Sequence, residues 1–354
     1  WSMGFISLVI TAFVYTCKYW ILHGVFGQIE ADVMHHADVY LLIVTASIPF
    51  IALYNGGAAI FRAMGNSEVS MKVSLLMNAI NVSGNAILIY GFHCGTEGVA
   101  IPTLVSRFVA AFIIIKLLLK DKWSLHLERT FRFNPDWSMI RKILSVGIPN
   151  GLENSMFQLG KVLVLSLVST FGTYAIAANA VSNVITLFSI LPGQAICLAV
   201  TTVIARCVGA GDYEQAKYYN KKLILLTHIG MAITIFIVFI TLPFILKVYN
   251  LSEAASEATR HIIWFHGFCA ILIWAESFTL PATFRACGDA KACMIISTVS
   301  MWIFRVGASY ILGKNLGLGV FGVWVAMIID WAFRSLLFGI RYFSGKWKKH
   351  ALVS

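Results

Sequence analysis

The sequence predicts an all-α membrane protein with about ten spans, arranged as two helical lobes that repeat one another in parallel. Three observations lead to this fold class: the composition, the placement of the basic residues and an internal repeat. Hydrophobic residues make up 59% of the 354 residues and charged residues only 12%, whereas an average soluble domain has about 25% charged residues. Runs such as 232–246 are apolar on every side, which is typical of helices buried in protein or lipid. Because nearly every segment has this character, the core of a water-soluble protein does not explain it.

The spans follow from the length of the apolar runs. A helix needs about 20 mainly apolar residues to cross the hydrocarbon core of a bilayer. The runs lack the alternation of polar and apolar residues that a membrane β-barrel requires. The predicted spans are 2–26, 39–60, 73–91, 98–119, 143–171, 174–203, 223–246, 262–283, 295–312 and 319–338.

Most of the 27 lysines and arginines fall on alternate loops between these spans. The opposite loops hold only Lys247, Arg260 and Lys314. An excess of basic residues marks the cytoplasmic side, so we expect a multi-pass protein of the bacterial cytoplasmic (inner) membrane with a cytoplasmic C-terminus. Topology and contact with anionic membrane lipid account for the net charge of +11, and no nucleic-acid partner is predicted.

The third observation is an internal repeat. The segment 61–66, Phe-Arg-Ala-Met-Gly-Asn, returns as 284–289, Phe-Arg-Ala-Cys-Gly-Asp, and the same shift also pairs Gly84 with Gly307. An ordered series of such matches indicates a repeated architecture. An even number of spans separates the two motifs, so the repeat is parallel and its axis lies along the membrane normal.

The repeat also predicts the division of the chain. The second half holds more residues before its motif than the first, with room for two further spans. We therefore expect a full protein of twelve spans, six in each lobe, of which this chain carries the last four of the first lobe. The predicted divisions are an N-lobe at 1–119, a cytoplasmic linker at 120–142, a C-lobe at 143–345 and a cytoplasmic tail at 346–354.

Several segments carry a resemblance to a known family. They include FRAMGNSEVSMKVSLLMNAINVSGNAILIYG and GVAIPT in the first half, and GTYAIAANAVSN, LPGQAI, VGAGDYEQAK, LPATFRACGD and GVWVAMIIDWAFR in the second. In their order and spacing the chain resembles the MATE (multidrug and toxic compound extrusion) transporters. The resemblance implies a non-enzymatic antiporter, expected to be a monomer, whose two lobes open alternately to each side of the membrane. It implies small organic substrates, often lipophilic cations, and no cofactor beyond a coupling ion, H⁺ or Na⁺.

Two glutamates inside apolar spans are the first candidates for the coupling site. Glu153 lies in the span 143–171 and Glu276 in the span 262–283. Ionisable groups are strongly disfavoured in lipid, which makes them functional candidates. Burial disfavours the charged form of a carboxyl group, so it can exchange a proton near neutral pH, and it can also attract Na⁺ or a cationic drug. The alternative is a carboxylate that only bonds to a neighbouring helix. The resemblance places acidic cation-site residues in these two spans, although in a different register.

A polar stripe in the span 73–91 is the second candidate. Asn78, Asn81 and Asn85 share one helix face by their spacing. The resemblance implies that Asn81, Asn85 and Thr103 occupy positions of a first-lobe cation site, with Asn85 replacing an aspartate. Such amides also join helices by hydrogen bonds, and both interpretations stay open.

Further polar groups lie in the second half. Asn179 and Asn183 stand one turn apart before Pro192-Gly193, which is expected to kink the helix; packing is slightly favoured over substrate binding for them. Gln158 is a weaker cavity candidate. No metal site is predicted, apart from Na⁺ at the residues already named.

Other charged groups are expected to have structural roles. The spacing predicts that Asp330 and Arg334 pair on one helix face, with Arg305 as a further partner of Asp330. Lys161 is a candidate to neutralise Glu153. The histidines show no metal-ligand spacing and are expected to be surface or packing residues.

Three other functions agree less well with these residues. A flippase for lipid-linked oligosaccharides or a related polysaccharide exporter shares this general architecture but has a more basic cavity. An intramembrane enzyme needs clustered aspartates or a nucleophile or metal motif, and a channel needs a pore motif or charged ring in both halves. Glu153, Glu276 and the asparagines favour a cation-coupled exporter.

Overall fold

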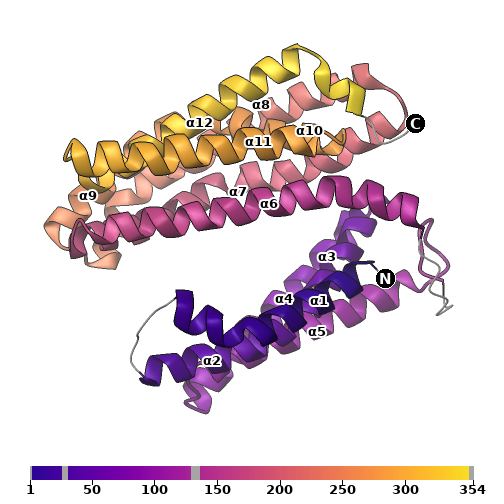
Figure 1. The fold of residues 1–354 in the computed structure, drawn as a ribbon, viewed down its shortest axis with the longest axis horizontal. Coiled ribbons are helices and arrows are strands. Elements are labelled where there is room, and N and C mark those ends of the chain that lie inside the picture. The colour runs from indigo at the N-terminus through magenta and orange to yellow at the C-terminus, as the bar shows by residue number, and fades with distance from the viewer. Residues whose placement is uncertain (1, 26–30, 129–135, 351–354) are drawn as a thin grey trace. The chain divides into compact units, whose positions relative to one another are not determined.

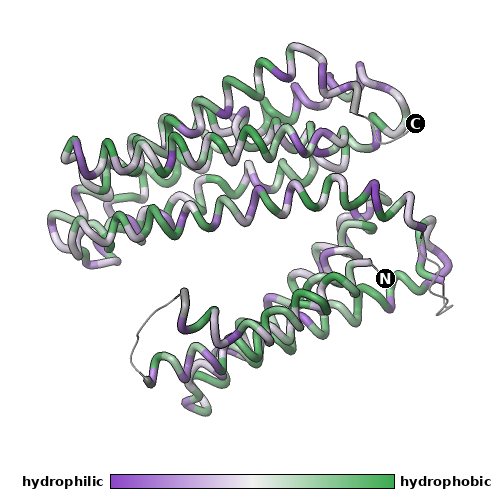
Figure 2. Tube along the Cα trace, in the orientation of Figure 1, coloured by the Kyte–Doolittle hydropathy of each residue, from purple (hydrophilic) through white to green (hydrophobic). Residues whose placement is uncertain are grey.

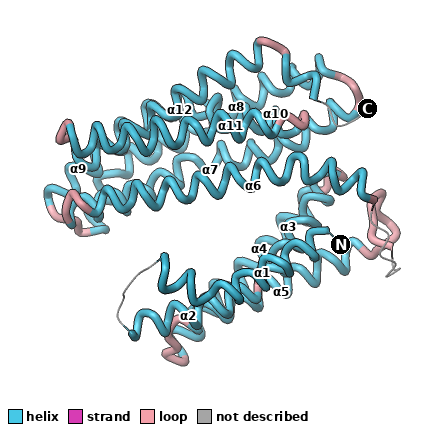
Figure 3. The backbone as a smooth tube through the Cα atoms, viewed as in Figure 1, coloured by secondary structure: helices cyan, strands magenta, loops and turns pink. Residues whose placement is uncertain are grey.

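The computed structural model describes residues 2–25, 31–128 and 136–350, and this part of the chain consists of helices joined by short loops (Figures 1 and 3). The helices form two compact units, Trp1–Asp136 and Trp137–Ser354, called here unit 1 and unit 2. Parts of the predicted linker and tail, 129–135 and 351–354, lie outside the described residues. The predicted lobe boundaries therefore stay predictions.

Unit 1 contains five α-helices and two short π-helical segments within its described residues. Its core lies between α3, α4 and α5 and includes Tyr54, Phe61, Val73 and Ile114, all of them buried. The bounds are α1 Ser2–Trp20, η1 Ile21–Val25, α2 Ala31–Ala46, α3 Ile48–Ala63, α4 Ser67–Ala86, η2 Ile87–Gly91 and α5 Glu97–Leu118.

Helices α4 and α5 approach one another closely at Gly84. A Cβ atom built on Gly84 would lie 2.7 Å from the Cβ of Pro102. Small residues permit this closeness between membrane helices, whose association depends on van der Waals packing and interhelical hydrogen bonds. The close approach positions the asparagines of α4 beside Thr103 of α5.

Unit 2 is built from longer helices. Its core is rich in aromatic residues, among them Trp274, Trp324 and Trp331. The bounds are α6 Trp137–Ser169, α7 Thr173–Gly209, α8 Tyr213–Tyr249, α9 Glu253–Trp274, η3 Ala275–Thr279, α10 Leu280–Ala286, α11 Ala290–Ser300, η4 Met301–Gly307, η5 Tyr310–Asn315, α12 Gly319–Phe343 and η6 Lys346–His350.

Prolines lie inside several long helices without ending them. Pro192 lies inside α7, which continues from Thr173 to Gly209. The hydroxyl of Thr234 on α8 donates a 2.9 Å hydrogen bond to the carbonyl of Ser189, one turn before Pro192. A neighbouring helix therefore satisfies a carbonyl close to the proline, as helices in lipid require. Pro149 similarly lies inside α6.

The repeated motif adopts the same turn in both units. Gly65 and Gly288 have positive φ angles of 83° and 85°, a conformation that glycine adopts without strain. The amide of Asn66 donates to the carbonyl of Phe61 over 2.9 Å, and the amide of Asp289 donates to that of Phe284 over 2.8 Å. This pattern closes the helix ends, so the internal repeat extends to backbone geometry.

Nine helical segments in the described residues are long and apolar enough to cross a membrane. They match nine of the ten predicted spans, and Figure 2 shows hydrophobic residues along the helices of both units. The tenth predicted span is α6, a helix of 33 residues. It is more polar because it carries Arg141, Lys142, Glu153 and Lys161. The prediction of an all-α, multi-pass membrane protein is confirmed.

Candidate functional site

Glu153 forms an ion pair with Arg285 of the repeated motif. A guanidinium nitrogen of Arg285, on α10, donates to Oε1 of Glu153, on α6, over 2.7 Å. The side chains are 9% exposed for Glu153 and 25% exposed for Arg285. The direct ion-pair partner of Glu153 is therefore Arg285, and an indirect effect of Lys161 on Glu153 stays a prediction. The pair joins two helices that lie 132 residues apart in sequence.

Glu276 forms the second acidic contact, with a histidine. Glu276 lies in the π-helical segment η3, and its Oε1 is 2.9 Å from Nε2 of His228, on α8. The other ring nitrogen of His228, Nδ1, lies 2.7 Å from the carbonyl oxygen of Ile271. A carbonyl can only accept, so Nδ1 carries a proton and Nε2 faces the carboxylate. The second oxygen of Glu276 is buried and has no hydrogen-bond partner among the described residues.

In unit 1 the predicted polar stripe forms a hydrogen-bonded chain. The amide of Asn81 donates to the hydroxyl of Thr103 over 3.0 Å, and the amide of Asn85 donates to Oδ1 of Asn81 over 3.3 Å. Thr103 in turn donates to the carbonyl of Val99. The chain joins α4 to α5. Oδ1 of Asn85 is buried and accepts no hydrogen bond from any residue that the structure describes. Asn78 is exposed and does not take part in the hydrogen-bonded chain.

The polar pair of α7 lines a cavity of about 250 Å³ within unit 2. Oδ1 of Asn179 accepts a 3.2 Å hydrogen bond from the indole of Trp324, on α12. Asn183 donates to the backbone carbonyl of Asn179. The lining residues are Lys161, Val164, Leu165, Asn179, Asn183, Arg305, Val323, Trp324 and Met327. Gln158 is exposed and does not line this cavity.

The charged residues of α12 are bound differently from the sequence prediction. Asp330 accepts a 2.5 Å hydrogen bond from Ser300. Arg334 donates to the carbonyl of Ser277 and stacks on the ring of Phe278. No ion pair joins Asp330 and Arg334, so that predicted contact is wrong. Arg305 likewise makes no ion pair with Asp330 and donates to the sulfur of Met327.

Sequence reasoning missed the basic partners of both glutamates. His228 lies near the middle of α8, a strongly apolar helix. The rule that intramembrane ionisable groups are functional candidates could have selected it together with Glu276. Arg285 lies in the loop between the predicted spans 262–283 and 295–312. No pattern among its neighbours in the sequence indicates a contact with Glu153.

In the described part of the chain no three His, Cys, Asp or Glu side chains come together. The seven cysteines are free thiols. The polar groups of the site are instead single pairs and chains that join helices, placed within membrane-spanning segments.

Long apolar helices that carry paired ionisable side chains define the general class of multi-pass membrane proteins with a functional site inside the membrane-spanning segments. The comparisons identify the family within that class. The MatE family matches residues 1–87 and 149–311, and the chain belongs to this family. It is therefore a transporter and not an enzyme.

Individual relatives agree with this assignment. The chain is similar to the probable multidrug resistance protein NorM of Thermotoga maritima, with 26% identity over 94% of this chain and 72% of the relative. It is also similar to the probable multidrug resistance protein YoeA of Bacillus subtilis, with 25% identity over 91% of this chain and 70% of the relative.

A solved structure shows the same fold. It is an outward-facing multidrug resistance transporter of the MATE family, with a TM-score of 0.88 and 19% identity over 98% of this chain and 78% of that one. The fold of the chain is therefore that of the MATE transporters.

Proposed function

We propose that the protein is a multidrug exporter of the bacterial cytoplasmic membrane that works by proton antiport and alternating access. Membership of the MatE family supports export, and the relatives described as multidrug resistance proteins support small organic substrates. The observation that carries the coupling proposal is the contact between His228 and Glu276 inside membrane-spanning helices.

The two side chains hold one proton between them. Because Nδ1 of His228 donates to Ile271, the shared proton lies between Nε2 and the carboxylate of Glu276. The pair is either imidazolium with carboxylate or imidazole with carboxylic acid, and both forms have no net charge. A second proton leaves a cation without a counter-charge, and its release restores the neutral pair.

Such a change acts on the helices that carry the pair. His228 lies on α8 and Glu276 on η3, a π-helical segment at the end of α9. Single π-helical turns within α-helices occur frequently at functional sites. Protonation of the pair weakens its mutual attraction, so it alters the contact between α8 and η3. Proton binding can drive transport only if the proton binds the two conformations of the transporter with different affinity.

Protons suit this pair better than Na⁺ does. Na⁺ is a hard cation that prefers oxygen ligands, whereas Glu276 faces a ring nitrogen. Glu153 is already neutralised by Arg285. The remaining candidate for Na⁺ is the Asn81, Asn85 and Thr103 chain of unit 1, which offers only neutral oxygens. Proton coupling at His228 and Glu276 is therefore the proposal.

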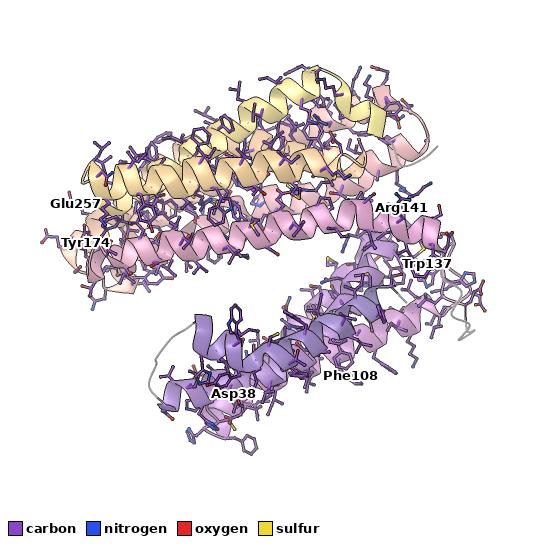
Figure 4. The ribbon with its side chains drawn as sticks, viewed as in Figure 1. Asp38, Phe108, Trp137, Arg141, Tyr174 and Glu257 are labelled. Carbon is purple, nitrogen blue, oxygen red and sulfur yellow. The ribbon has the colours of Figure 1, made fainter. Side chains whose placement is uncertain are left out.

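The orientation follows from the basic ends of the helices. Trp137 and Arg141 lie at one end of unit 2, and Tyr174 and Glu257 lie at the opposite end (Figure 4). The loop between α7 and α8 belongs to the first end and is flanked by Arg206 and Lys217. We propose that this end is cytoplasmic, together with the C-terminus.

Lipophilic cations are the substrates that the family resemblance implies. In the sequence, Glu153 and Glu276 favoured a positively charged substrate. In the structure each of them is paired with a basic residue, so their charges give no further support to cationic substrates. A comparison of the transport of a cationic dye and of an aromatic carboxylate by the same preparation decides whether the substrates are cations or anions.

The coupling is tested in proteoliposomes with an imposed pH gradient. Glu276→Gln and His228→Gln are expected to reduce gradient-driven export of the dye at least about tenfold, as expected when a proton carrier is lost. Glu257→Gln and His261→Gln, two changes on α9 remote from the pair, are the matched controls and are expected to keep wild-type transport.

Three outcomes count against the proposal. If Glu276→Gln exports the dye at the wild-type rate under a pH gradient, the pair does not couple transport. If a sodium gradient alone drives export in the wild type, Na⁺ replaces the proton. If neither gradient drives movement of any organic solute, the export function itself is wrong.

A further inference from the structure

The cavity of unit 2 has an unusual charge for a protein expected to handle cations. Its walls come from α6, α7, η4 and α12, and they contain the two basic residues Lys161 and Arg305. Among the described residues that line it there is no aspartate or glutamate. The remaining walls combine asparagine amides with apolar side chains.

Neither basic group is neutralised by an ion pair in the described part of the chain. Arg305 donates to the sulfur of Met327 over 3.0 Å and lies over the ring of Phe157 at 5.2 Å. The ammonium group of Lys161 lies 5.2 Å from the centre of the same ring. Aromatic faces attract cations only weakly, so these contacts supply no counter-charge to either group.

The carboxylate of Asp330 does not balance this charge. Asp330 attracts both Arg305 and Arg334, and one of its oxygens is taken by Ser300. Asp330 is therefore shared by two arginines, and Lys161 has no ion-pair partner in the described part of the chain. Lys161 and Arg305 also repel each other, and an added anion relieves the repulsion between like charges.

The neutral residues of the cavity provide a second type of contact. The carbonyl oxygen of Asn179 is held by the indole of Trp324. Its amide nitrogen makes no hydrogen bond to any described residue, which leaves two N–H donors available beside the basic groups. Trp324, Val323 and Val164 supply apolar walls in the same cavity.

We propose that this cavity is a subsite for the carboxylate group of a small organic compound. Lys161 and Arg305 neutralise the carboxylate, Asn179 donates to it, and Trp324 with its apolar neighbours contacts the hydrocarbon part. The volume of about 250 Å³ suits a single aromatic ring with one acidic group. That such a compound is transported rests on the proposed export function, whereas its binding does not.

The test compares two probes of similar size and opposite charge. Benzoate and benzylammonium are titrated into the purified chain in detergent, in low-salt buffer and without any ion gradient, and the heat of binding is measured. Benzoate is expected to bind saturably, while benzylammonium is not. Equal binding of both probes, or binding of benzylammonium alone, overturns the proposal.

The variants locate the site. Arg305→Gln and Lys161→Gln are each expected to weaken benzoate binding roughly tenfold to a hundredfold, the range for losing a charged hydrogen bond. Lys314 is exposed, lies in the same span as Arg305 and does not line the cavity. Lys314→Gln is therefore the matched control and is expected to bind benzoate like the wild type. Unchanged benzoate binding in both cavity variants overturns the proposal.

Two additional measurements keep the result unambiguous. Lys161 is exposed and makes no hydrogen bond in the described structure, so Lys161→Gln tests the cavity even if Arg305→Gln fails to fold. If phosphatidylglycerol displaces benzoate while phenylacetate does not, the cavity belongs to a lipid headgroup and the assignment is wrong. Benzoate binding without gradient-driven export of any organic solute would instead refute the export function and leave the subsite in place.

Discussion

Replacement of Glu153 by glutamine tests how the ion pair with Arg285 holds unit 2 together. Glu153→Gln keeps the shape of the side chain and removes its charge, which leaves the guanidinium of Arg285 without its counter-charge. Removing one partner of a buried pair typically costs about 3 to 5 kcal/mol. Arg285 is 25% exposed, so water screens part of the loss and we expect a cost near the lower end, about 3 kcal/mol.

The loss is expected to appear as a lower thermal transition. For a unit of this size a destabilisation of 1 kcal/mol lowers Tm by about 2 to 4 °C, so the variant is expected to melt about 6 to 12 °C below the wild type. A thiol-reactive dye reports this melting in detergent, because Cys287 and Cys293 are 1% and 0% exposed in the folded protein. Both thiols lie close to Arg285 in sequence.

A double variant separates the ion pair from general packing. Glu153→Gln with Arg285→Gln removes both charges, so no unpaired charge remains buried and at least half of the lost stability is expected to return. Glu214→Gln is the control, because that carboxylate pairs with Lys217 at the surface and is 79% exposed. An unchanged Tm for Glu153→Gln, or a double variant whose loss equals the sum of the single losses, would refute the reasoning.

Two further predictions concern contacts between helices. Asn81→Ala removes the bond from α4 to α5 and is expected to destabilise unit 1 by about 1 kcal/mol, measured as a lower Tm, while Asn78→Ala on the exposed face leaves Tm unchanged. Gly193→Ala places a Cβ atom 2.2 Å from the ring of Trp274 and is expected to cost about 1 to 3 kcal/mol by overpacking. Gly151→Ala, with nothing within 4 Å, is its control, and equal melting of the two glycine variants would contradict the packing argument.

The helices themselves were predictable from sequence because their signals are local. An apolar run of about 20 residues is a property of neighbouring residues and of the lipid around them, so each predicted span corresponds to a helical segment in the structure. The turn within each repeated motif also depends on neighbouring residues alone, since Gly65 and Gly288 adopt the positive φ angles that glycine permits. The more polar α6 was recognised by the same criterion despite its four charged residues.

The partners of the buried charged groups could not be predicted in this way. Glu153 and Arg285 are 132 residues apart, and His228 and Glu276 are 48 residues apart. Which side chains meet across such distances depends on how each helix is rotated and how deeply it packs. Spacing along one helix suggested the pair of Asp330 and Arg334, but Ser300 and Ser277 from other helices bind these groups instead.

By itself the sequence determined that this protein is a helical membrane protein with an internal repeat, and its motifs were enough to indicate the MATE transporters. Hydrophobicity, helix length and glycine turns are read over a few neighbouring residues, which explains this success. Only the tertiary structure decided that Glu153 pairs with arginine, that Glu276 lies within hydrogen-bond distance of a histidine, and that Lys161 and Arg305 line one cavity. These arrangements depend on the packing of distant helices, where the energy of a charge is determined by the groups that surround it.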